Sequence, residues 1–314
     1  MLKGGLPIAR CAAMELLQRY LPLVDDPDAF LAAHEVPLPR VVWANPIQGD
    51  VLETGRLLLQ VCPEAVPLTW TPHAWRLPHT VKPGKWEIYR RGLIHAQEEA
   101  ALLASMIMEA KPGQRILDMC SSPGNKSAQL GVMTHDQATI IANEYSWRRI
   151  APMRFNFDRL GLLGVAITNM DGRRFPMPDV LFDSVLVDAP CSCEGTLRKS
   201  NGPVRLQRAF EFHDSAMAVQ IGLLRRAVEM TRPGGVIVYA TCTYAPEENE
   251  RVLDGIWPEK AAIEKIEVPE GLHVSPGIAE WEGRTFRPDV QNAIRFWPHR
   301  SDTGGFFMAK LRRL

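Results

Sequence analysis

The sequence predicts an α/β protein in which a doubly wound, mostly parallel sheet follows a smaller α/β unit. From Gly92 onward, apolar runs of strand length alternate with helical segments, the pattern of βαβ units. Two of these runs, at residues 184–190 and 235–241, are almost wholly apolar, as buried parallel strands are, and reactive residues follow both. Because ligands of open α/β sheets bind at the carboxyl ends of the strands, we expect the functional site where these runs end.

The first part of the chain predicts the smaller unit. Helical spacing predicts a helix from residue 12 to a break at Pro22, a short helix over residues 28–34 and another over 51–62. Strand patterns lie on either side of this last helix, in PRVVWAN and PLTWTPHAWRLP. Prolines and a basic run follow, so we predict a domain at residues 1–91 and a second at 92–314.

In the larger unit, strands and helices alternate to the end of the chain. Strands are predicted at residues 115–120, 138–144, 165–171, 184–190 and 235–241. Helices are predicted over residues 97–110, from about residue 128, and over 205–231. The run FFMAKL at 306–311 predicts a last strand at the edge of the sheet.

Composition excludes several classes of protein. With 46% hydrophobic and 23% charged residues, the chain has the balance of a soluble protein, and no apolar run reaches the roughly 18 residues of a membrane span. Charges interrupt the N-terminal apolar residues, which favours an amphipathic helix over a signal peptide. We therefore expect a cytoplasmic monomer without membrane contact. Six cysteines in a chain of 314 residues predict reduced thiols, and because Cys191 and Cys193 have no second pair of similar spacing, we expect no metal.

Basic residues gather in two places, although the net charge is zero. The segment 73–91 interleaves Lys and Arg with Trp75, Trp86 and Tyr89, a combination that suits single-stranded RNA. A second basic run follows the cysteine loop. The alternative for the first segment is a solvated surface with half-buried tryptophans. The predicted RNA contacts are Arg76, Lys82, Lys85, Arg90, Arg91, Arg198 and Lys199.

The first predicted strand of the larger unit opens into the loop SSPGNKS. A glycine-containing loop between a strand and a helix brings backbone N–H groups close to a ligand, although neither G-x-G-x-x-G nor a Walker A motif is present. Glu144, Asp171 and Asp188 end three other strands, where acids accept hydrogen bonds from ribose or a base, or act as helix N-caps. Together, these three acids predict a ligand that carries a nucleoside. Because no phosphate-binding motif is present, S-adenosylmethionine is favoured over NAD as that ligand.

Cys191 and Cys242 follow the two strands predicted to be neighbours. Carbon 5 of cytosine is too weak a nucleophile to attack a methyl sulfonium, but a thiolate added to carbon 6 converts the ring into an enamine that can. Such a thiol needs surroundings that lower its pKa, and Lys126 is a candidate for this role. The alternative is buried, inert cysteine.

At these residues the chain resembles the NOL1/NOP2/Sun family of RNA cytosine-5 methyltransferases. The family's cofactor loop appears as DMCSSPGNK (118–126), its Asp-Ala-Pro-Cys motif as DAPCSCEG (188–195), and its Thr-Cys motif as TCTY (241–244). GLIHAQEEAALL (92–103) and the final FFMAKL are also similar to the family. The resemblance implies a Rossmann-like S-adenosylmethionine-dependent methyltransferase domain behind a small N-terminal α/β domain that engages RNA.

The resemblance also implies roles for individual residues. Cys242 would attack carbon 6, Cys191 would help to release the product, and Asp188 would contact the base edge or the cofactor. The residues implied in holding S-adenosylmethionine are Cys120, Ser121, Ser122, Pro123, Gly124, Asn125, Lys126, Glu144, Arg149, Asp171 and Asp188. Cys193 stands where the family has glycine, and it removes the conformational freedom of a glycine beside the active site.

These observations predict methyl transfer from S-adenosylmethionine to carbon 5 of a cytosine in structured RNA, with ribosomal RNA favoured over tRNA. The target base must be unpaired or flipped out, because carbon 6 is inaccessible in a stacked helix. One alternative is a DNA cytosine-5 methyltransferase, which would use the cysteine after proline, Cys191, as its nucleophile. Another is a non-catalytic RNA-binding scaffold.

Overall fold

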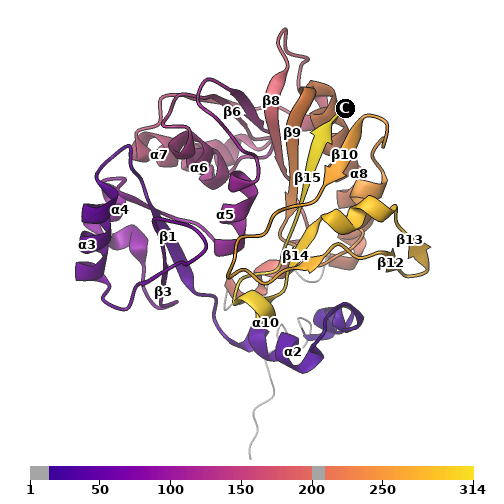
Figure 1. Ribbon diagram of the computed structural model, residues 1–314, viewed down its shortest axis with the longest axis horizontal. Coiled ribbons are helices and arrows are strands. Elements are labelled where there is room, and N and C mark those ends of the chain that lie inside the picture. The colour runs from indigo at the N-terminus through magenta and orange to yellow at the C-terminus, as the bar shows by residue number, and fades with distance from the viewer. Residues whose placement is uncertain (1–13, 200–208) are drawn as a thin grey trace, which may run out of the picture.

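A nine-stranded mixed sheet forms the centre of the computed structural model, which describes residues 14–199 and 209–314 (Figure 1). The strand order is β11-β14-β15-β9-β8-β5-β6-β7, with β10 beside β15. Strands β5 to β9 are parallel to their neighbours within this set, and β15 is antiparallel to β9. The strands are β5 (Arg115–Asp118), β6 (Thr139–Asn143), β7 (Val165–Thr168), β8 (Phe182–Asp188), β9 (Thr231–Thr241), β10 (Ala261–Glu264), β11 (Ser275–Pro276), β14 (Ile294–Phe296) and β15 (Phe306–Arg313).

The central strands are buried on both faces, as the apolar runs predicted. Along β9, Val238 and Ala240 face one core with α5 (Glu99–Met106), α6 (Asn125–Met133) and α7 (Ile150–Leu160). Ile237 and Tyr239 face the other core with α8 (Ala209–Met230) and α9 (Glu250–Asp254). The α/β fold with a central parallel sheet is therefore confirmed. The predicted start of the long helix, residues 205–208, lies outside the described residues.

The last strand is not at the edge of the sheet, so that prediction was wrong. Strand β15 pairs with β9 on one side and with β14 and β10 on the other. The physical reason is its side chains: residues 306–311 are all buried, and such a strand is stable where neighbours cover both of its hydrogen-bonding edges.

A separate four-stranded sheet, in the order β2-β3-β1-β4, precedes the large one. Val42 and Ile94 face a small core with two helices, whereas Val41 and Trp43 pack against the large domain. The last strand of this sheet, β4, lies beyond residue 91, so the small sheet extends past the predicted domain boundary. The division of the chain into two domains at that residue stays a prediction. Its elements are β1 (Arg40–Ala44), α3 (Val51–Val61), β2 (Val66–Pro67), β3 (Ala74–Leu77), η2 (Pro83–Lys85), α4 (Glu87–Arg90) and β4 (Ile94–Ala96).

The segment from residue 14 to 35 packs on the large domain rather than on the small sheet. Tyr20 and Phe30 are fully buried against Tyr244 and Trp297, and α2 contacts α10 at the bottom of Figure 1. Helix α2 begins after Asp26, whose side chain accepts a hydrogen bond from the Ala29 N–H. The first residues of the predicted N-terminal helix, 12–13, lie outside the described residues. The remaining elements are η1 (Leu21–Leu23), α2 (Pro27–Glu35), η3 (Trp147–Arg149), η4 (Gly172–Arg174), η5 (Glu194–Lys199), β12 (Glu280–Trp281), β13 (Arg284–Thr285), η7 (Pro288–Asn292) and α10 (Pro298–Ser301).

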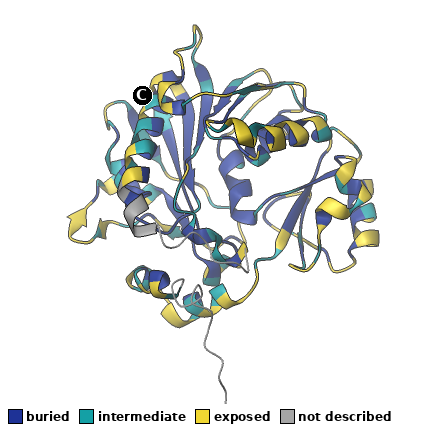
Figure 2. Ribbon diagram, turned by 180° about the vertical axis from the view of Figure 1, so that it is seen from behind, coloured by how far each residue is buried: buried dark blue, intermediate teal, exposed yellow. Residues whose placement is uncertain are grey.

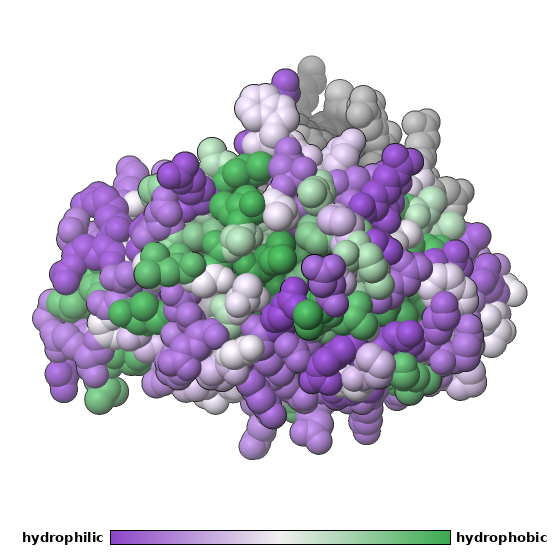
Figure 3. Space-filling model, turned by 90° about the horizontal axis from the view of Figure 1, so that it is seen from above, coloured by the Kyte–Doolittle hydropathy of each residue, from purple (hydrophilic) through white to green (hydrophobic). Residues whose placement is uncertain are grey.

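The surface is largely polar. Figure 2 shows buried residues concentrated in the central sheet, with exposed residues on the outer sides of the helices. Seen from above, hydrophilic side chains cover most of the surface and the hydrophobic ones lie mainly toward the middle of that face (Figure 3). None of the helices described is both long enough and apolar enough to cross a bilayer.

Candidate active site

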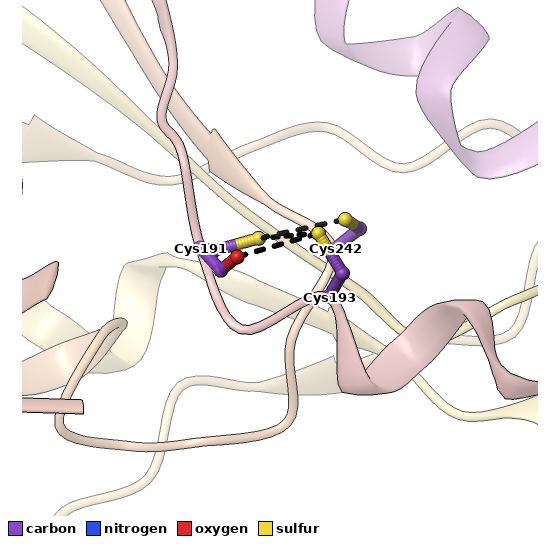
Figure 4. Close-up of side chains that lie close together, drawn as sticks. All are labelled: Cys191, Cys193 and Cys242. Atoms are coloured by element: carbon purple, nitrogen blue, oxygen red, sulfur yellow. Dashed lines mark hydrogen bonds between the residues drawn. The ribbon is translucent and has the colours of Figure 1, made fainter. Parts of the chain in front are cut away.

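The ends of two neighbouring strands bring Cys191 and Cys242 together. Strands β8 and β9 are parallel, with Asp188 opposite Ala240, so the chain leaves both strands at the same edge of the sheet. The two sulfur atoms lie 3.5 Å apart. Figure 4 shows the two side chains directed toward each other. The predicted meeting of these thiols is therefore present in the structure.

A third thiol joins them. The Cys193 sulfur lies 3.9 Å from the Cys191 sulfur, and all three sulfurs lie within 4.8 Å of one another. Cys193 has φ +62°, in the left-handed region that favours glycine, the residue that the resemblance implies at this position. The loop thus keeps a glycine-like conformation with a cysteine in it.

The pKa values of the three thiols depend on one another. Hydrogen bonds from Cys191 and Cys242 lower the pKa of Cys193 to about 4, because they stabilise its thiolate. For Cys242, a hydrogen bond from Cys191 favours the thiolate, but donation to Cys193, burial and the negative charge of Cys193 together raise its pKa to about 12. The Cys193 sulfur also lies 3.3 Å from the Cys191 carbonyl oxygen, to which it can donate only when protonated. The protonation state of Cys193 therefore decides which of these contacts forms.

Two buried acids hold the cysteine loop, and neither was predicted. The Glu248 carboxylate accepts a hydrogen bond from the Ser192 N–H at 3.1 Å, and Glu194 accepts from the Tyr20 hydroxyl at 2.6 Å and from the Thr243 hydroxyl at 3.1 Å. Both glutamates are fully buried. The motif PEENE contains Glu248, but no local pattern indicates that its side chain turns back to the loop. Because these bonds join the β8 and β9 loops, they fix the positions of the two strand ends.

Lys126 and Asp188 form an ion pair beside the thiols. The Lys126 ammonium donates to Asp188 at 2.6 Å. Burial opposes the lysine charge, but the attraction of Asp188 outweighs it and raises the pKa of Lys126. The same ammonium interacts electrostatically with Cys242. The pKa of Cys242 is nevertheless raised, so the lowering expected from the sequence is not observed.

The loop from Cys120 to Gly124 connects β5 to α6. Gly124 has φ +95°, and a Cβ there would lie 2.9 Å from the Phe157 ring, so the loop requires glycine. At the end of β5, Asp118 is fully buried and accepts a hydrogen bond from the Ser127 hydroxyl at 2.7 Å, and burial raises its pKa to about 6. Asp118 was not among the predicted site residues.

Glu144 lies at the end of β6 and faces this loop. Its carboxylate accepts from the Ser146 N–H at 2.7 Å and lies 3.4 Å from the Arg149 guanidinium, which itself donates to the Ser122 carbonyl at 2.9 Å. The N–H groups of the first turn of α6 have no partner within the helix and can donate to a ligand. Amide donors on one strand end and a carboxylate on the next suit a ligand with acceptor groups and ribose hydroxyls, so these residues fit S-adenosylmethionine.

Asp171 does not end a strand. Strand β7 stops at Thr168, and Asp171 is the N-cap of η4, with its side chain bound to the backbone and guanidinium of Arg173. These bonds lower the pKa of Asp171, the side-chain bond from Arg173 most of all. Asp171 therefore acts as a helix N-cap, which was the alternative to ligand binding given for the acids at the strand ends.

The family is decided by comparison with known proteins. The family described as 16S rRNA methyltransferase RsmB/F matches residues 105–312. The chain belongs to this family. The resemblance to the NOL1/NOP2/Sun proteins is thereby confirmed, and with it the prediction of an enzyme of the RNA cytosine-5 methyltransferase class.

Relatives of this RsmB/F family member carry two kinds of name. The tRNA (cytosine(49)-C(5))-methyltransferase of Pyrococcus abyssi is 34% identical, over 95% of this chain and 96% of the relative. The ribosomal RNA small subunit methyltransferase F of Erwinia tasmaniensis is 30% identical over 96% of this chain, but this chain spans only 63% of that relative's length.

Solved structures share the fold. A methyltransferase homolog protein from Pyrococcus horikoshii has a TM-score of 0.82 and 25% identity, and the match covers 98% of this chain and 100% of that one. NSun6 from the same organism, solved with SFG, has a TM-score of 0.82 at 19% identity, and the match covers 95% of this chain and 97% of that one. The Rossmann-like methyltransferase fold is therefore confirmed.

The predicted RNA contacts divide by exposure. Arg198 is buried: its guanidinium donates to the carbonyls of Val36 and Thr303 and pairs with Asp302, so the structure contradicts a direct RNA contact for it. The physical reason is that α2 covers this arginine. Arg76 is half-buried and pairs with Glu99. The contacts that remain exposed are Lys82, Lys85, Arg90, Arg91 and Lys199.

The aromatic residues of the segment 73–91 are not a stacking surface. Trp75 is buried in the small core, and Trp86 and Tyr89 are partly buried against it. These residues therefore fit the alternative given for this segment, a solvated surface with its tryptophans buried or half-buried. The exposed aromatic side chains lie elsewhere, with Tyr145 and Trp147 more than 70% exposed directly after Glu144.

A hollow of about 600 Å³ lies between α2 and α10. Basic residues contribute much of its lining, which includes Arg76, Arg198, His273, His299 and Arg300, with Asp302 among them. The hollow therefore contains two of the arginines predicted from the basic runs, although both are held by acids of the protein itself.

Proposed function

We propose that this chain transfers a methyl group from S-adenosylmethionine to carbon 5 of a cytosine in structured RNA, through a covalent bond between Cys242 and carbon 6. The observation that supports this most directly is the 3.5 Å separation of the Cys191 and Cys242 sulfurs at one sheet edge. S-adenosylmethionine, when bound, supplies the electrophilic methyl group. The loop 120–126, with Glu144 and Arg149, would hold it, and Asp171 remains in the proposed set although Arg173 occupies its carboxylate.

Cys242 begins the reaction as a thiolate. Its thiol proton must first pass to solvent; the raised pKa of Cys242 opposes this loss, and the positive charges of Lys126 and Lys199 favour it. The sulfur then forms a bond to carbon 6, and the electron pair of the C5–C6 double bond moves to carbon 5, which becomes nucleophilic enough to take the methyl group. Asp188 can accept a hydrogen bond from the exocyclic amino group at the base edge.

Cys191 completes the reaction. After methyl transfer, the proton on carbon 5 must pass to a base, the C5–C6 double bond reforms, and the bond between Cys242 and carbon 6 breaks with the sulfur leaving as thiolate. We assign proton removal to the Cys191 thiolate, because its sulfur is close enough to Cys242 to serve an adduct held there. Hydrogen bonds to Cys193 and Cys242, with burial, raise the pKa of Cys191, so its own thiol proton must pass to solvent before it can act as the base.

The RNA class is the finer part of the proposal. The sequence alone favours ribosomal RNA. The relative that matches along nearly its whole length is named for tRNA, whereas the relative named for ribosomal RNA is longer than this chain. Both substrates therefore enter the test, with tRNA the first choice.

The test uses purified full-length protein, labelled S-adenosylmethionine, and tRNA, small-subunit rRNA or DNA as substrate. We expect label in cytosine 5-methyl groups of RNA. Cys242→Ala should lower the rate at least about 10³-fold, since loss of a nucleophile can cost about 10⁶-fold. Cys191→Ala should accumulate an RNA–protein adduct that survives a denaturing gel. Cys62→Ser, in the core of the small sheet, is the matched thiol control and should behave as wild type.

Three results would contradict the proposal. Normal methylation by Cys242→Ala would exclude the assigned nucleophile, and an adduct formed by that variant would transfer the role to Cys191. Methylation of DNA in preference to RNA would support the alternative DNA methyltransferase. Calorimetric binding of RNA without any methyl transfer would support the non-catalytic scaffold.

A further inference from the structure

Cys193 is a thiol that the proposed reaction does not use. It lies within the same loop as Cys191, and its side chain points toward the other two sulfurs (Figure 4). From the sequence we expected no metal, because this pair has no second pair of similar spacing. The fold changes that reasoning, because Cys242 supplies a third sulfur from the neighbouring strand.

The sulfur separations suit coordination of one ion. With Zn–S bonds of about 2.3 Å, two sulfurs of a tetrahedral site lie about 3.8 Å apart. Two of the observed separations, 3.5 and 3.9 Å, lie on either side of that value, and the third is within 4.8 Å. A disulfide requires about 2.0 Å, so the observed arrangement is closer to a metal site than to a bonded pair.

We propose that Cys191, Cys193 and Cys242 form a three-thiolate site for a thiophilic d¹⁰ cation, with Zn²⁺ as the representative ion. Binding would form three Zn–S bonds and release to solvent the protons that the thiols still hold, with water in the fourth position. Three thiolates and Zn²⁺ carry a net charge of −1, which the nearby cations Lys126 and Lys199 would offset, since both interact electrostatically with Cys242.

The surrounding hydrogen bonds hold the three sulfurs in place. The Gly195 N–H donates to the Cys242 carbonyl at 2.9 Å, and the Ser192 and Thr243 hydroxyls are 2.7 Å apart. Thr196 donates to the Cys193 carbonyl at 2.7 Å. Such contacts join the two loops before any ion binds, and outer contacts of this kind strengthen metal sites.

The site has a consequence for the enzyme. An ion held by Cys242 and Cys191 would block attack on carbon 6, so Zn²⁺ and the target cytosine would exclude each other. This consequence rests on the proposed function, whereas zinc binding itself does not.

Binding is tested without RNA. Full-length protein, kept reduced with a non-thiol reductant, competes for Zn²⁺ with a chromophoric chelator. We expect one Zn²⁺ per chain, and we expect Cys193→Gly to weaken binding at least about tenfold, since loss of even an outer-shell partner costs about 10–100-fold. Cys62→Ser should bind as wild type does. With Co²⁺ as the probe, the sulfur-to-metal charge-transfer band should be weaker in Cys193→Gly.

The same experiment can overturn the proposal. Equal zinc affinity in wild type and Cys193→Gly would exclude Cys193 as a ligand, and absence of a charge-transfer band with Co²⁺ would exclude thiolate coordination. A thermal melt of each variant confirms that it is folded. A protein that binds Zn²⁺ as expected but methylates nothing would leave the site standing and contradict only the proposed function.

Discussion

The cysteine loop and the basic segment 73–91 both carry predicted functional residues, but buried hydrogen bonds fix the first, whereas the second lies largely at the surface. The loop is held by buried bonds such as that of Glu248 to the Ser192 N–H. The segment presents Lys82 and Lys85 to solvent and buries its aromatic side chain Trp75 in the small core. A strand end fixes where a reactive residue lies, whereas a run of charges does not tell which side chains remain at the surface.

Substitution of Glu194 is expected to have the largest effect on stability, since its carboxylate holds the cysteine loop in place. Its buried carboxylate accepts hydrogen bonds from Tyr20, Thr243 and His213. Glu194→Ala should lower the free energy of unfolding by about 3–5 kcal/mol, the cost of breaking a buried charged network. Urea denaturation measures this, with exposed Glu267→Ala as the control, expected within about 0.5 kcal/mol of wild type. A decrease below about 1 kcal/mol would mean that the loop is not held by this network.

Arg198 and Lys199 compare buried and exposed charge at adjacent positions. Arg198→Met removes three hydrogen bonds and leaves Asp302 without this partner, so we expect a decrease of about 2–4 kcal/mol in the free energy of unfolding. Lys199→Met should change that quantity by less than about 0.5 kcal/mol. Urea denaturation of both variants is the measurement, and equal effects would contradict the assignment of Arg198 to the interior.

Much of the fold was predictable because burial leaves a clear pattern. The apolar runs of β8 and β9 and the alternation with helices are local features of the sequence, and parallel neighbours then bring Cys191 and Cys242 together. Asp188 and Lys126 were likewise found from motifs, although only the structure shows that they pair.

The rest depends on contacts between distant segments. The outer neighbours of β15, the strands β14 and β10, come from chain segments with weak strand patterns, so its central position was not visible in the sequence. Arg198 is buried because α2, more than 160 residues earlier, covers it. The left-handed conformation of Cys193 and the return of Glu248 to the loop are likewise properties of the folded chain.

His95 lies where the small sheet meets the large domain. It lies in β4 of the small sheet, accepts from the Arg159 guanidinium at 2.6 Å, and its other ring nitrogen is 3.0 Å from the Asn125 side-chain oxygen of the cofactor loop. Burial, with the charge of Arg159, lowers the pKa of His95 from 6.5 to about 4. Above pH 6.5 the ring is neutral in both states, so His95 adds no pH dependence there.

As the pH falls from 6.5 toward 4, the unfolded state binds a proton that the folded state does not, so stability decreases. At pH 4.5 the decrease attributable to His95 should be about 2–3 kcal/mol relative to pH 7.5. Denaturant titrations at both pH values, on wild type and His95→Gln, measure it. The variant should be destabilised less on acidification, and an identical decrease would show that His95 is not the group responsible.

The exposed lysines provide the smallest expected effect. Lys82→Gln and Lys85→Gln should leave stability unchanged and weaken RNA binding, with the slope of log affinity against log salt reduced by about one for each phosphate that is no longer neutralised. Lys111→Gln is the matched control, because Lys111 is also exposed but precedes β5, at the opposite edge of the sheet from the cysteines. Filter binding at several salt concentrations gives the slopes. If all three variants change the slope equally, binding follows total charge rather than position, and the basic segment is no more than a solvated surface.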